Sequence, residues 1–527
     1  MSKKNFLLRD LSTINTVSAF LEFLISLIEL DVVYKQEDLE KVIDKAEEIE
    51  CFDLRFLPLL REVFANLPVL ETLVERQFFY AASLSTQVKN QKPVNKIAFV
   101  CEKLAGGGVE RVISLLSEVY TEIGKDVIVI TEVRLPNEYK IPETTKRFVV
   151  PLSNDRYKCL DEILCSENID TVVLTDYWRD IAFKTAVWSR LKELNVISQE
   201  HNSFFCPIFE NALWRFKYRR ASYQASHLLT CLNTTDELLW KQSGVANARY
   251  VPNPSTFQSA KDVPNWAERG DNVALVSRFC QDKGIQFIPE LIRAIANIRP
   301  TVRFFLCGWF MSDADEKWFY QEVDRLKVRN YIAFIGRTNQ VKAILNQTKV
   351  LILPSTHEGS PMVLLEARAL AVPSVIFGMH YLDNANRGVV RVPFGRVDLM
   401  AKEILSLLSD GTYWNQLSKD AQLGLEIWQK DHLKQVWSDL FDSIHRSGEV
   451  KRDEKSFNKD SQFLMMDEFH NSVDYFNSNF SALSESDRVK IGRYDYMMRF
   501  VHRFFPDGSW RKNLLRKVLR TLKQNVL

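Results

Sequence analysis

Two glutamates, Glu358 and Glu366, stand eight positions apart where an apolar run passes into a helix-forming segment. Glu366 has mostly apolar neighbours, and a carboxylate in such surroundings needs a polar partner. The cis-diol of a ribose can be that partner, because one carboxylate accepts hydrogen bonds from two adjacent hydroxyls. The alternative is that Glu358 is a solvated loop residue and Glu366 an exposed position on an amphipathic helix.

The residues between the two glutamates predict a helix start that can hold an anion. Ser360 is a favourable N-cap and Pro361 a favourable first helical residue. The unpaired N–H groups around Met362 and Val363, together with the positive end of the helix dipole, form a site for a phosphate. This anion site lies within a nucleotide's reach of Glu366.

Two cations, Arg278 and Lys283, follow an apolar run at residues 273–276. Because this run predicts a strand that ends before a helix, both side chains are expected at a strand end. Two cations placed there can neutralise a diphosphate. Each of them, taken alone, is also explained as an ordinary solvent-facing loop residue.

Three glycines at 106–108 open a helix-forming segment after the apolar run 96–101. Adjacent glycines let the backbone approach a ligand closely, although a Gly-rich turn can also be a plain connection. The run is not the full dinucleotide fingerprint, because the third glycine would fall on Arg111. Glu132 ends the next apolar run, roughly where a nicotinamide-binding enzyme keeps its ribose acid, so that alternative stays open.

His201 follows the apolar run 196–198, within the segment Glu200-His201-Asn202. Ligands of open α/β sheets bind beyond the carboxyl ends of the strands, so a histidine there is a candidate for chemistry. A lone histidine is nevertheless more often structural than catalytic.

The elements that must position these residues are two series of short apolar runs that alternate with helices. The first series comprises residues 96–101, 127–131, 148–150, 171–175, 196–198, 228–231 and 250–251. The second comprises residues 273–276, 302–306, 332–335, 350–353 and 374–377. Such alternation predicts parallel sheets with helices on both faces. Two doubly wound α/β domains in tandem are therefore expected, after a first 92 residues with helical periodicity.

Composition narrows the class of protein. A chain of 527 residues is long enough for two or more domains, and a net charge of +2 argues against a dedicated nucleic-acid binder. The eight cysteines are scattered without a C-x-x-C pair, which we interpret as reduced, buried thiols in a reducing compartment. The start of the chain shows no secretory signal, and the apolar segment 17–30 is too short and too charged to span a bilayer.

Taken together, these motifs resemble the retaining glycosyltransferases of family 4, the group 1 transferases, over roughly residues 96–444. The resemblance rests on five motifs. They are a GG-x-E loop at 107–110, E-H-N at 200–202, V-P-N-P at 251–254, an R-x4-K-G pair at 278–284 and a Glu-x7-Glu pattern at 358–366 that opens with E-G-S-P-M. It implies the GT-B fold, in which two Rossmann-like domains face a cleft. Ser360 and Pro361 replace the commoner Phe-Gly, and Ala371 replaces a usual glycine, which leaves the identity of the donor open.

The resemblance also implies roles for individual residues. Catalytic roles fall on Glu358, His201, Arg278 and Lys283. Donor-binding roles fall on Gly107, Gly108, Arg278, Lys283, Glu358, Gly359, Ser360, Pro361, Met362, Val363 and Glu366. We expect no metal and no cofactor, with a UDP-sugar as the favoured donor. Asp313 and Asp315 form a D-x-D, but acidic residues there suit a helix start. Without a metal, Arg278, Lys283 and the helix N-terminus must stabilise the negative charge on the leaving diphosphate.

The resemblance divides the chain into five parts. They are a helical extension at 1–92, an acceptor-side domain at 93–255, a nucleotide-sugar-binding domain at 256–425, a crossover helix at 426–447 and a C-terminal extension at 448–527. Within the last part, residues 510–527 combine a leucine face with a basic face. Such a helix either lies on an anionic membrane or packs against the N-terminal helices, and both readings stay open.

The sequence thus predicts a retaining transferase that moves a hexose or N-acetylhexosamine to a glycan or lipid-linked acceptor in bacterial surface polysaccharide synthesis. We expect it in the cytoplasm, either free or peripheral on the inner face of the membrane, with no nucleic-acid partner. The alternative is a catalytically inactive GT-B-like scaffold or subunit of a polysaccharide or protein glycosylation complex. Intact Glu358, Glu366, Arg278 and Lys283 favour the enzyme, because a scaffold does not need them.

Overall fold

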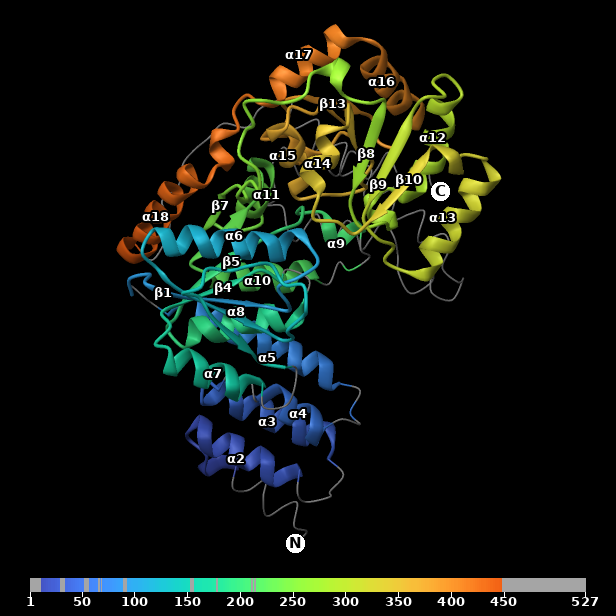
Figure 1. Cartoon of the computed structure of the whole chain (residues 1–527). Coiled ribbons are helices and arrows are strands. Elements are labelled where there is room, and N and C mark those ends of the chain that lie inside the picture. The colour runs from blue at the N-terminus through green and yellow to red at the C-terminus, as the bar shows by residue number, and fades with distance from the viewer. Residues whose placement is uncertain are drawn as a thin grey trace.

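The computed structural model describes residues 11–447 apart from 29–33, 52–55, 65–66, 68, 89–91, 152–155, 177–178, 210–211 and 213–214. The predicted C-terminal extension, with its basic helix at 510–527, lies outside the described residues. The described part contains two all-parallel sheets, which lie one above the other in the view of Figure 1. This confirms the expected fold class.

The first sheet has seven strands. In spatial order they are β3 (Lys146–Val149), β2 (Asp126–Thr131), β1 (Lys96–Cys101), β4 (Thr171–Leu174), β5 (Asn195–Gln199), β6 (Leu228–Cys231) and β7 (Ala248–Tyr250). Its helices are α6 (Gly108–Glu122), α7 (Arg156–Ser166), α8 (Asp180–Leu191), α9 (Cys206–Phe209), α10 (Arg215–Ala225) and α11 (Thr234–Gln242).

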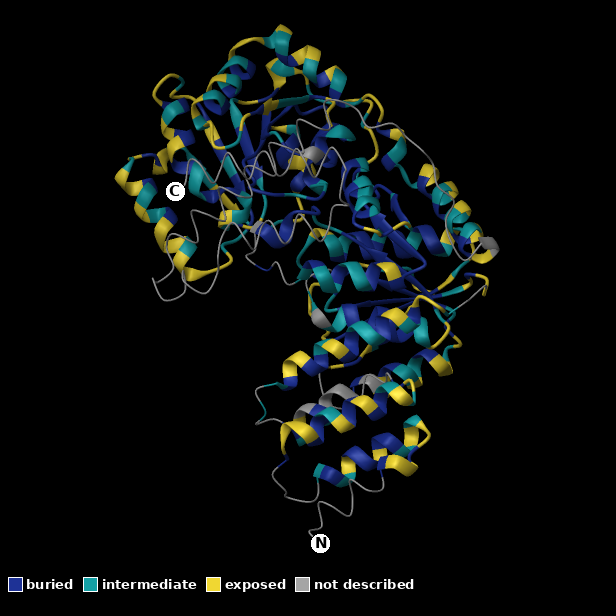
Figure 2. Cartoon of the chain, turned by 180° about the vertical axis from the view of Figure 1, so that it is seen from behind, coloured by how far each residue is buried: buried dark blue, intermediate teal, exposed yellow. Residues whose placement is uncertain are grey.

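Alternate residues of the central strand β1 pack into different cores. Ile97 and Phe99 belong to the core under α6, whereas Ala98 and Val100 belong to the core on the opposite face. Both faces of the sheet are therefore covered, which explains why its strands read as continuous apolar runs. In Figure 2 the buried positions concentrate in the strands of both sheets.

The second sheet has six strands. In spatial order they are β10 (Ile332–Gly336), β9 (Arg303–Cys307), β8 (Asn272–Val276), β11 (Val350–Leu353), β12 (Ser374–Phe377) and β13 (Val389–Val392). Its helices are α12 (Ile288–Ala296), α13 (Asp313–Arg325), α14 (Val341–Asn346), α15 (Met362–Ala369), α16 (Val397–Ser409) and α17 (Gly411–Ala421). The sequence patterns predicted every strand of this sheet except β13, which is an edge strand whose pairing is with β12 alone.

The N-terminal helices share a core with the first sheet. They are α2 (Val17–Ile28), α3 (Gln36–Glu48), α4 (Phe56–Val63) and α5 (Leu70–Ser85), at the lower end of Figure 1. The Phe78 ring of α5 lies 4.9 Å from the Tyr218 ring of α10, and Arg190 of α8 donates to the carbonyl oxygen of Val88 at 2.7 Å. These contacts join the helices to the face of the sheet opposite α6.

The last described helix, α18 (Lys430–Ser447), returns from the second sheet to pack on α6. Its Trp437 ring lies 5.0 Å from the ring of Tyr120, and Lys434 forms an ion pair with Glu122 at 2.6 Å. The GT-B resemblance implied a crossover helix at residues 426–447, and α18 lies within that range.

Two further expectations concern cysteines and membrane spans. All eight cysteines are free, but Cys159 and Cys165 are exposed on α7, so the expectation of buried thiols is wrong for these two. Both face water because α7 covers the sheet with its other side. Within the described residues, no helix combines the length and apolarity that crossing a bilayer requires.

Candidate functional site

Glu358 lies in the loop that follows β11, where it accepts two hydrogen bonds. Lys283 Nζ donates to its Oε1 at 2.7 Å, and the Ser355 hydroxyl donates to the same oxygen at 2.8 Å. The carboxylate is mostly buried, with 12% of the side chain exposed. The structure therefore brings together two of the predicted catalytic residues, 75 positions apart in the chain.

Gly284 makes this pairing possible. Its φ of +74° lies in the left-handed region, and a Cβ at this position would meet the Pro354 carbonyl oxygen at 1.9 Å. The backbone N–H of Thr356 also donates to the carbonyl oxygen of Asp282 at 2.9 Å. The loop that carries Lys283 thus packs directly on the loop that carries Glu358, and only glycine fits at the contact.

Helix α15 begins one residue later than the sequence predicted. Pro361 is its N-cap, and no side chain caps the first turn, so the expectation of Ser360 as N-cap and Pro361 as first helical residue is wrong. The reason is the extended backbone of Pro361, whose ψ is 121°. Proline has no side-chain acceptor, so the first N–H groups of α15 keep their capacity to bind an anion.

The glycine loop before α6 faces the start of α15. A Cβ on Gly108 would lie 3.6 Å from Cγ of Met362, and one on Gly106 would lie 3.0 Å from a guanidinium nitrogen of Arg337. Gly107 is the N-cap of α6 and has extended backbone. The predicted donor-binding glycines of one half of the chain therefore lie against the predicted anion site of the other half.

His201 approaches the same region from the first sheet. A Cβ on Gly359 would lie 2.7 Å from the His201 carbonyl oxygen, and Asn233 Nδ2 donates to the Gly359 carbonyl at 3.4 Å. The imidazole Nε2 is buried without a hydrogen-bond partner in the described structure. Burial lowers the pKa of His201 to about 4, so the ring is neutral at pH 7.

The loop that carries His201 is fixed by a buried carboxylate. Glu200 is 1% exposed and accepts hydrogen bonds from Arg219 Nε at 3.1 Å, from the Tyr223 hydroxyl at 2.7 Å and from the backbone N–H of Asn202 at 3.1 Å. Burial raises the pKa of Glu200, and the Arg219 guanidinium opposes that rise. The last hydrogen bond closes the turn around His201 itself.

Glu366 has a partner that the sequence did not predict. Arg111 of α6 donates to its Oε1 at 2.6 Å, and only 3% of the Glu366 side chain is exposed. Burial raises the pKa of Glu366, and the Arg111 charge opposes that rise. The carboxylate expected to bind ribose hydroxyls is thus held by a residue of the other half of the chain, 255 positions away.

The two predicted diphosphate ligands differ in exposure. Arg278 is exposed, whereas Lys283 is half-buried. The Arg278 charge opposes the burial-driven rise in the pKa of Glu110, which lies in the first turn of α6. An ammonium carries three N–H donors, so Lys283 can bind Glu358 and a further oxygen at once.

Two alternatives from the sequence have structural explanations. Asp313 and Asp315 lie in the first turn of α13, where Ser312 caps the backbone N–H of Asp315 at 3.1 Å, so the D-x-D opens a helix. Glu132 forms ion pairs with Arg156 at 3.0 Å and Arg179 at 2.6 Å. Its carboxylate is therefore engaged, which argues against a ribose acid in a nicotinamide site.

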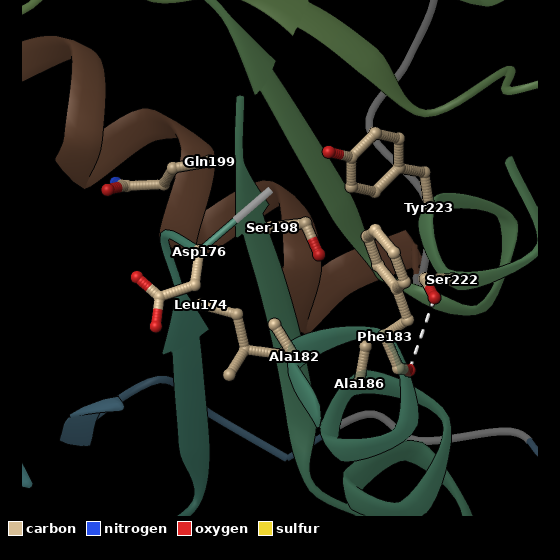
Figure 3. Close-up of a pocket in the computed structure, with 9 residues that line it drawn as sticks. All are labelled: Leu174, Asp176, Ala182, Phe183, Ala186, Ser198, Gln199, Ser222 and Tyr223. Atoms are coloured by element: carbon tan, nitrogen blue, oxygen red, sulfur yellow. Dashed lines mark hydrogen bonds between the residues drawn. The ribbon is translucent and has the colours of Figure 1, made fainter. Parts of the chain in front are cut away.

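A small pocket in the first domain lies behind the His201 loop, because Tyr223, which donates to Glu200, is one of its lining residues. It is lined by Leu174, Asp176, Ala182, Phe183, Ala186, Ser198, Gln199, Ser222 and Tyr223, with Asp176 and Gln199 on one side and Phe183 and Tyr223 on the other (Figure 3). Its volume is about 10 Å³, which is room for about one water molecule and far too little for a sugar or nucleotide. Burial raises the pKa of Asp176 to about 7. We assign the donor site to the loops around Glu358, because the charged and helix-terminal groups converge there.

The two parallel sheets and the returning helix α18 have the architecture of the GT-B glycosyltransferases. Residues 257–423, which contain the second sheet, match the model of the family described as Glycosyl transferases group 1. This match confirms the expected resemblance to the group 1 transferases and the expected class of enzyme, a glycosyltransferase.

Relatives with curated descriptions are similar over much of the chain. A Campylobacter jejuni protein described as an alpha-1,4-N-acetyl-D-galactosaminyltransferase, with a diNAcBac-PP-undecaprenol glycan in its name, is 24% identical over 48% of this chain and 69% of its own length. A Haemophilus influenzae protein described as an uncharacterized glycosyltransferase is 22% identical over 66% of this chain and all of its own length. Among solved structures, the Anabaena protein HepE in complex with UDP aligns with a TM-score of 0.55 and 15% identity, over 66% of this chain and all of its own, which shows the shared fold.

Sequence reasoning missed two features of the site. Arg111 gave no signal as a partner of Glu366, because the two residues are brought together only by the meeting of α6 and α15. The other feature is Arg337, whose guanidinium lies 4.0 Å from the Trp309 ring centroid at the carboxyl ends of β10 and β9. The strand-end rule, applied to the loops after β9 and β10, would have selected Trp309 and Arg337 for inspection.

Proposed function

We propose that this protein transfers a hexose or N-acetylhexosamine, with retention of configuration, from a nucleotide-diphosphate sugar to a lipid-linked or glycan acceptor of bacterial surface polysaccharide synthesis. The carrying observation is the meeting of Glu358, Lys283 and the uncapped start of α15 at one point, opposite the His201 loop. The undecaprenol-linked glycan in the name of the Campylobacter relative supports a lipid-linked acceptor.

The proposed donor is a UDP-sugar. Its diphosphate binds at the start of α15, where unpaired N–H groups attract an anion. Lys283 and Arg278 add positive charge at the same place, so the negative charge that develops on the departing diphosphate is stabilised without a metal ion in this proposal. The UDP in the structure of the Anabaena neighbour supports uracil as the nucleobase of the donor.

Glu358 and His201 act on the sugar in this proposal. Glu358 is held by Lys283 and Ser355, so its free oxygen can accept a hydrogen bond from a sugar hydroxyl. His201 keeps an unpartnered ring nitrogen and is neutral, so it can bond a second hydroxyl without adding charge near the reacting carbon. Both groups then orient the sugar between the two domains.

Substitution of Lys283 tests the diphosphate role. Lys283→Ala removes one preorganised charge from the leaving group, and we expect turnover to fall by roughly two to three orders of magnitude. Initial rates with a saturating acceptor measure this loss. Lys342→Ala, which removes an exposed lysine of α14 in the same domain, is the matched control and is expected to retain full turnover. Turnover of Lys283→Ala within a factor of two of wild type excludes the role.

We also propose that the protein works in the cytoplasm at the inner face of the membrane, where a lipid-linked acceptor is found. The motivation is the basic and leucine-rich sequence of residues 510–527. Each basic residue near an anionic surface contributes on the order of 1 kcal/mol. Liposome flotation tests this proposal.

A further inference from the structure

The ion pair between Arg111 and Glu366 joins the two halves of the chain at a site that the proposed donor also needs. Arg111 lies on α6, one turn after the glycine loop, and Glu366 lies on α15, one turn after the anion site. The Arg111 guanidinium also lies 5.8 Å from the Tyr139 ring centroid. In this structure the guanidinium therefore holds the buried carboxylate that the ribose is proposed to bind.

Resting on the proposed function, we infer that Arg111 occupies the place of the donor's ribose hydroxyls and sets donor affinity by competing with them for Glu366. A guanidinium and a cis-diol both present paired donors to a carboxylate. The side chain of Glu366 is 3% exposed, which leaves little room for both partners at once. Ribose binding therefore requires Arg111 to release the carboxylate.

The competition has a physical reason in the protein without donor. A buried carboxylate that lacks a partner is costly, so Glu366 needs a cation when no nucleotide is bound. Arg111 is 30% exposed, and rotation of its long side chain moves the guanidinium into water without moving α6. Apparent donor affinity then equals the intrinsic affinity multiplied by the fraction of molecules in which Glu366 is free.

The alternative is that Arg111 binds the donor's phosphates directly. This role predicts that the loss of Arg111 weakens UDP binding, whereas competition for Glu366 predicts that it strengthens UDP binding. A guanidinium that binds the diphosphate strengthens the binding of any ligand that carries two phosphates. If Arg111 instead competes for Glu366, it weakens the binding only of ligands that carry a ribose. UDP and inorganic pyrophosphate therefore separate the two roles.

Calorimetric titration of the full chain with UDP and with pyrophosphate is the test. Arg111→Met keeps the apolar length of the side chain, and we expect it to bind UDP about fivefold or more tightly than wild type. Its affinity for pyrophosphate should stay within a factor of two. Lys434→Ala, which breaks the ion pair between α18 and Glu122 of α6, is the matched control and should leave both affinities unchanged.

A double-mutant cycle makes the inference specific to the pair. In a Glu366→Ala background, Arg111→Met should no longer tighten UDP binding. Unchanged or weaker UDP binding by Arg111→Met, or equal tightening without Glu366, overturns the inference. Thermal unfolding verifies that each variant is folded, and Arg111→Ala is the second variant if Arg111→Met is not. Wild type that binds none of UDP, GDP and ADP contradicts the proposed function itself.

Discussion

At the scale of single residues, the candidate site is held together by charged pairs whose members lie far apart in the chain. Glu358 and Lys283 were both expected at the donor, and the structure places them 2.7 Å apart. Glu366 was expected to need a polar partner, and it has one, Arg111. Which partner it takes depends on the meeting of two helices, and spacing along the chain contains no information on that contact.

The protonation state of His201 gives a prediction at this scale. Burial lowers its pKa from 6.5 to about 4, so the neutral ring persists as the pH falls from 8 to about 5. We expect turnover to be flat across that range, without a titration near 6.5. His201→Gln should lower turnover by roughly 10- to 100-fold, the scale of one lost hydrogen bond in a buried site.

The lowered pKa of His201 also makes the free energy of unfolding depend on pH. The unfolded histidine binds a proton below about pH 6.5, whereas the folded one does so only near 4, so folding loses stability as the pH falls through this window. His201→Gln should reduce that loss in thermal unfolding, and His432→Gln, at an exposed position, should not. A wild-type activity loss centred near pH 6.5 that His201→Gln abolishes would contradict the neutral assignment.

At the scale of elements, strands were predictable because buried parallel strands are apolar throughout. Strands β1, β6, β11 and β12 have the predicted limits, whereas β13 was missed and α15 begins one residue late. Ala371, where the family usually has glycine, has a φ of +54° just after α15. The sequence departure therefore sits at a left-handed position after the helix, where glycine carries no steric cost.

The proposed membrane contact of residues 510–527 belongs to this scale as well. Flotation with anionic and neutral liposomes should carry the full chain up with anionic lipid only, and added salt should release it. A chain that ends before Trp510 is the comparison. If the shortened chain floats equally well, or if the full chain shows no preference for anionic lipid, this segment is not a membrane anchor.

At the scale of the whole molecule, the site exists only where the two sheets meet. Glu358, Lys283 and α15 come from the second half, while His201 and the glycine loop come from the first. Gly359 packs on the His201 backbone, and Lys434 of α18 binds Glu122 of α6. Tandem α/β domains could be predicted from the alternation of apolar runs, but these contacts follow from how the domains meet.

The most direct test of the central claim is a screen of the purified full chain against UDP-, GDP- and ADP-sugars, with and without EDTA. We expect slow hydrolysis of a UDP-hexose or UDP-N-acetylhexosamine that releases UDP, at the same rate with chelator present. The released sugar should keep the anomeric configuration of the donor. Failure to bind or cleave any nucleotide sugar would contradict glycosyl transfer, and a loss with EDTA that manganese or magnesium restores would contradict the metal-independent mechanism.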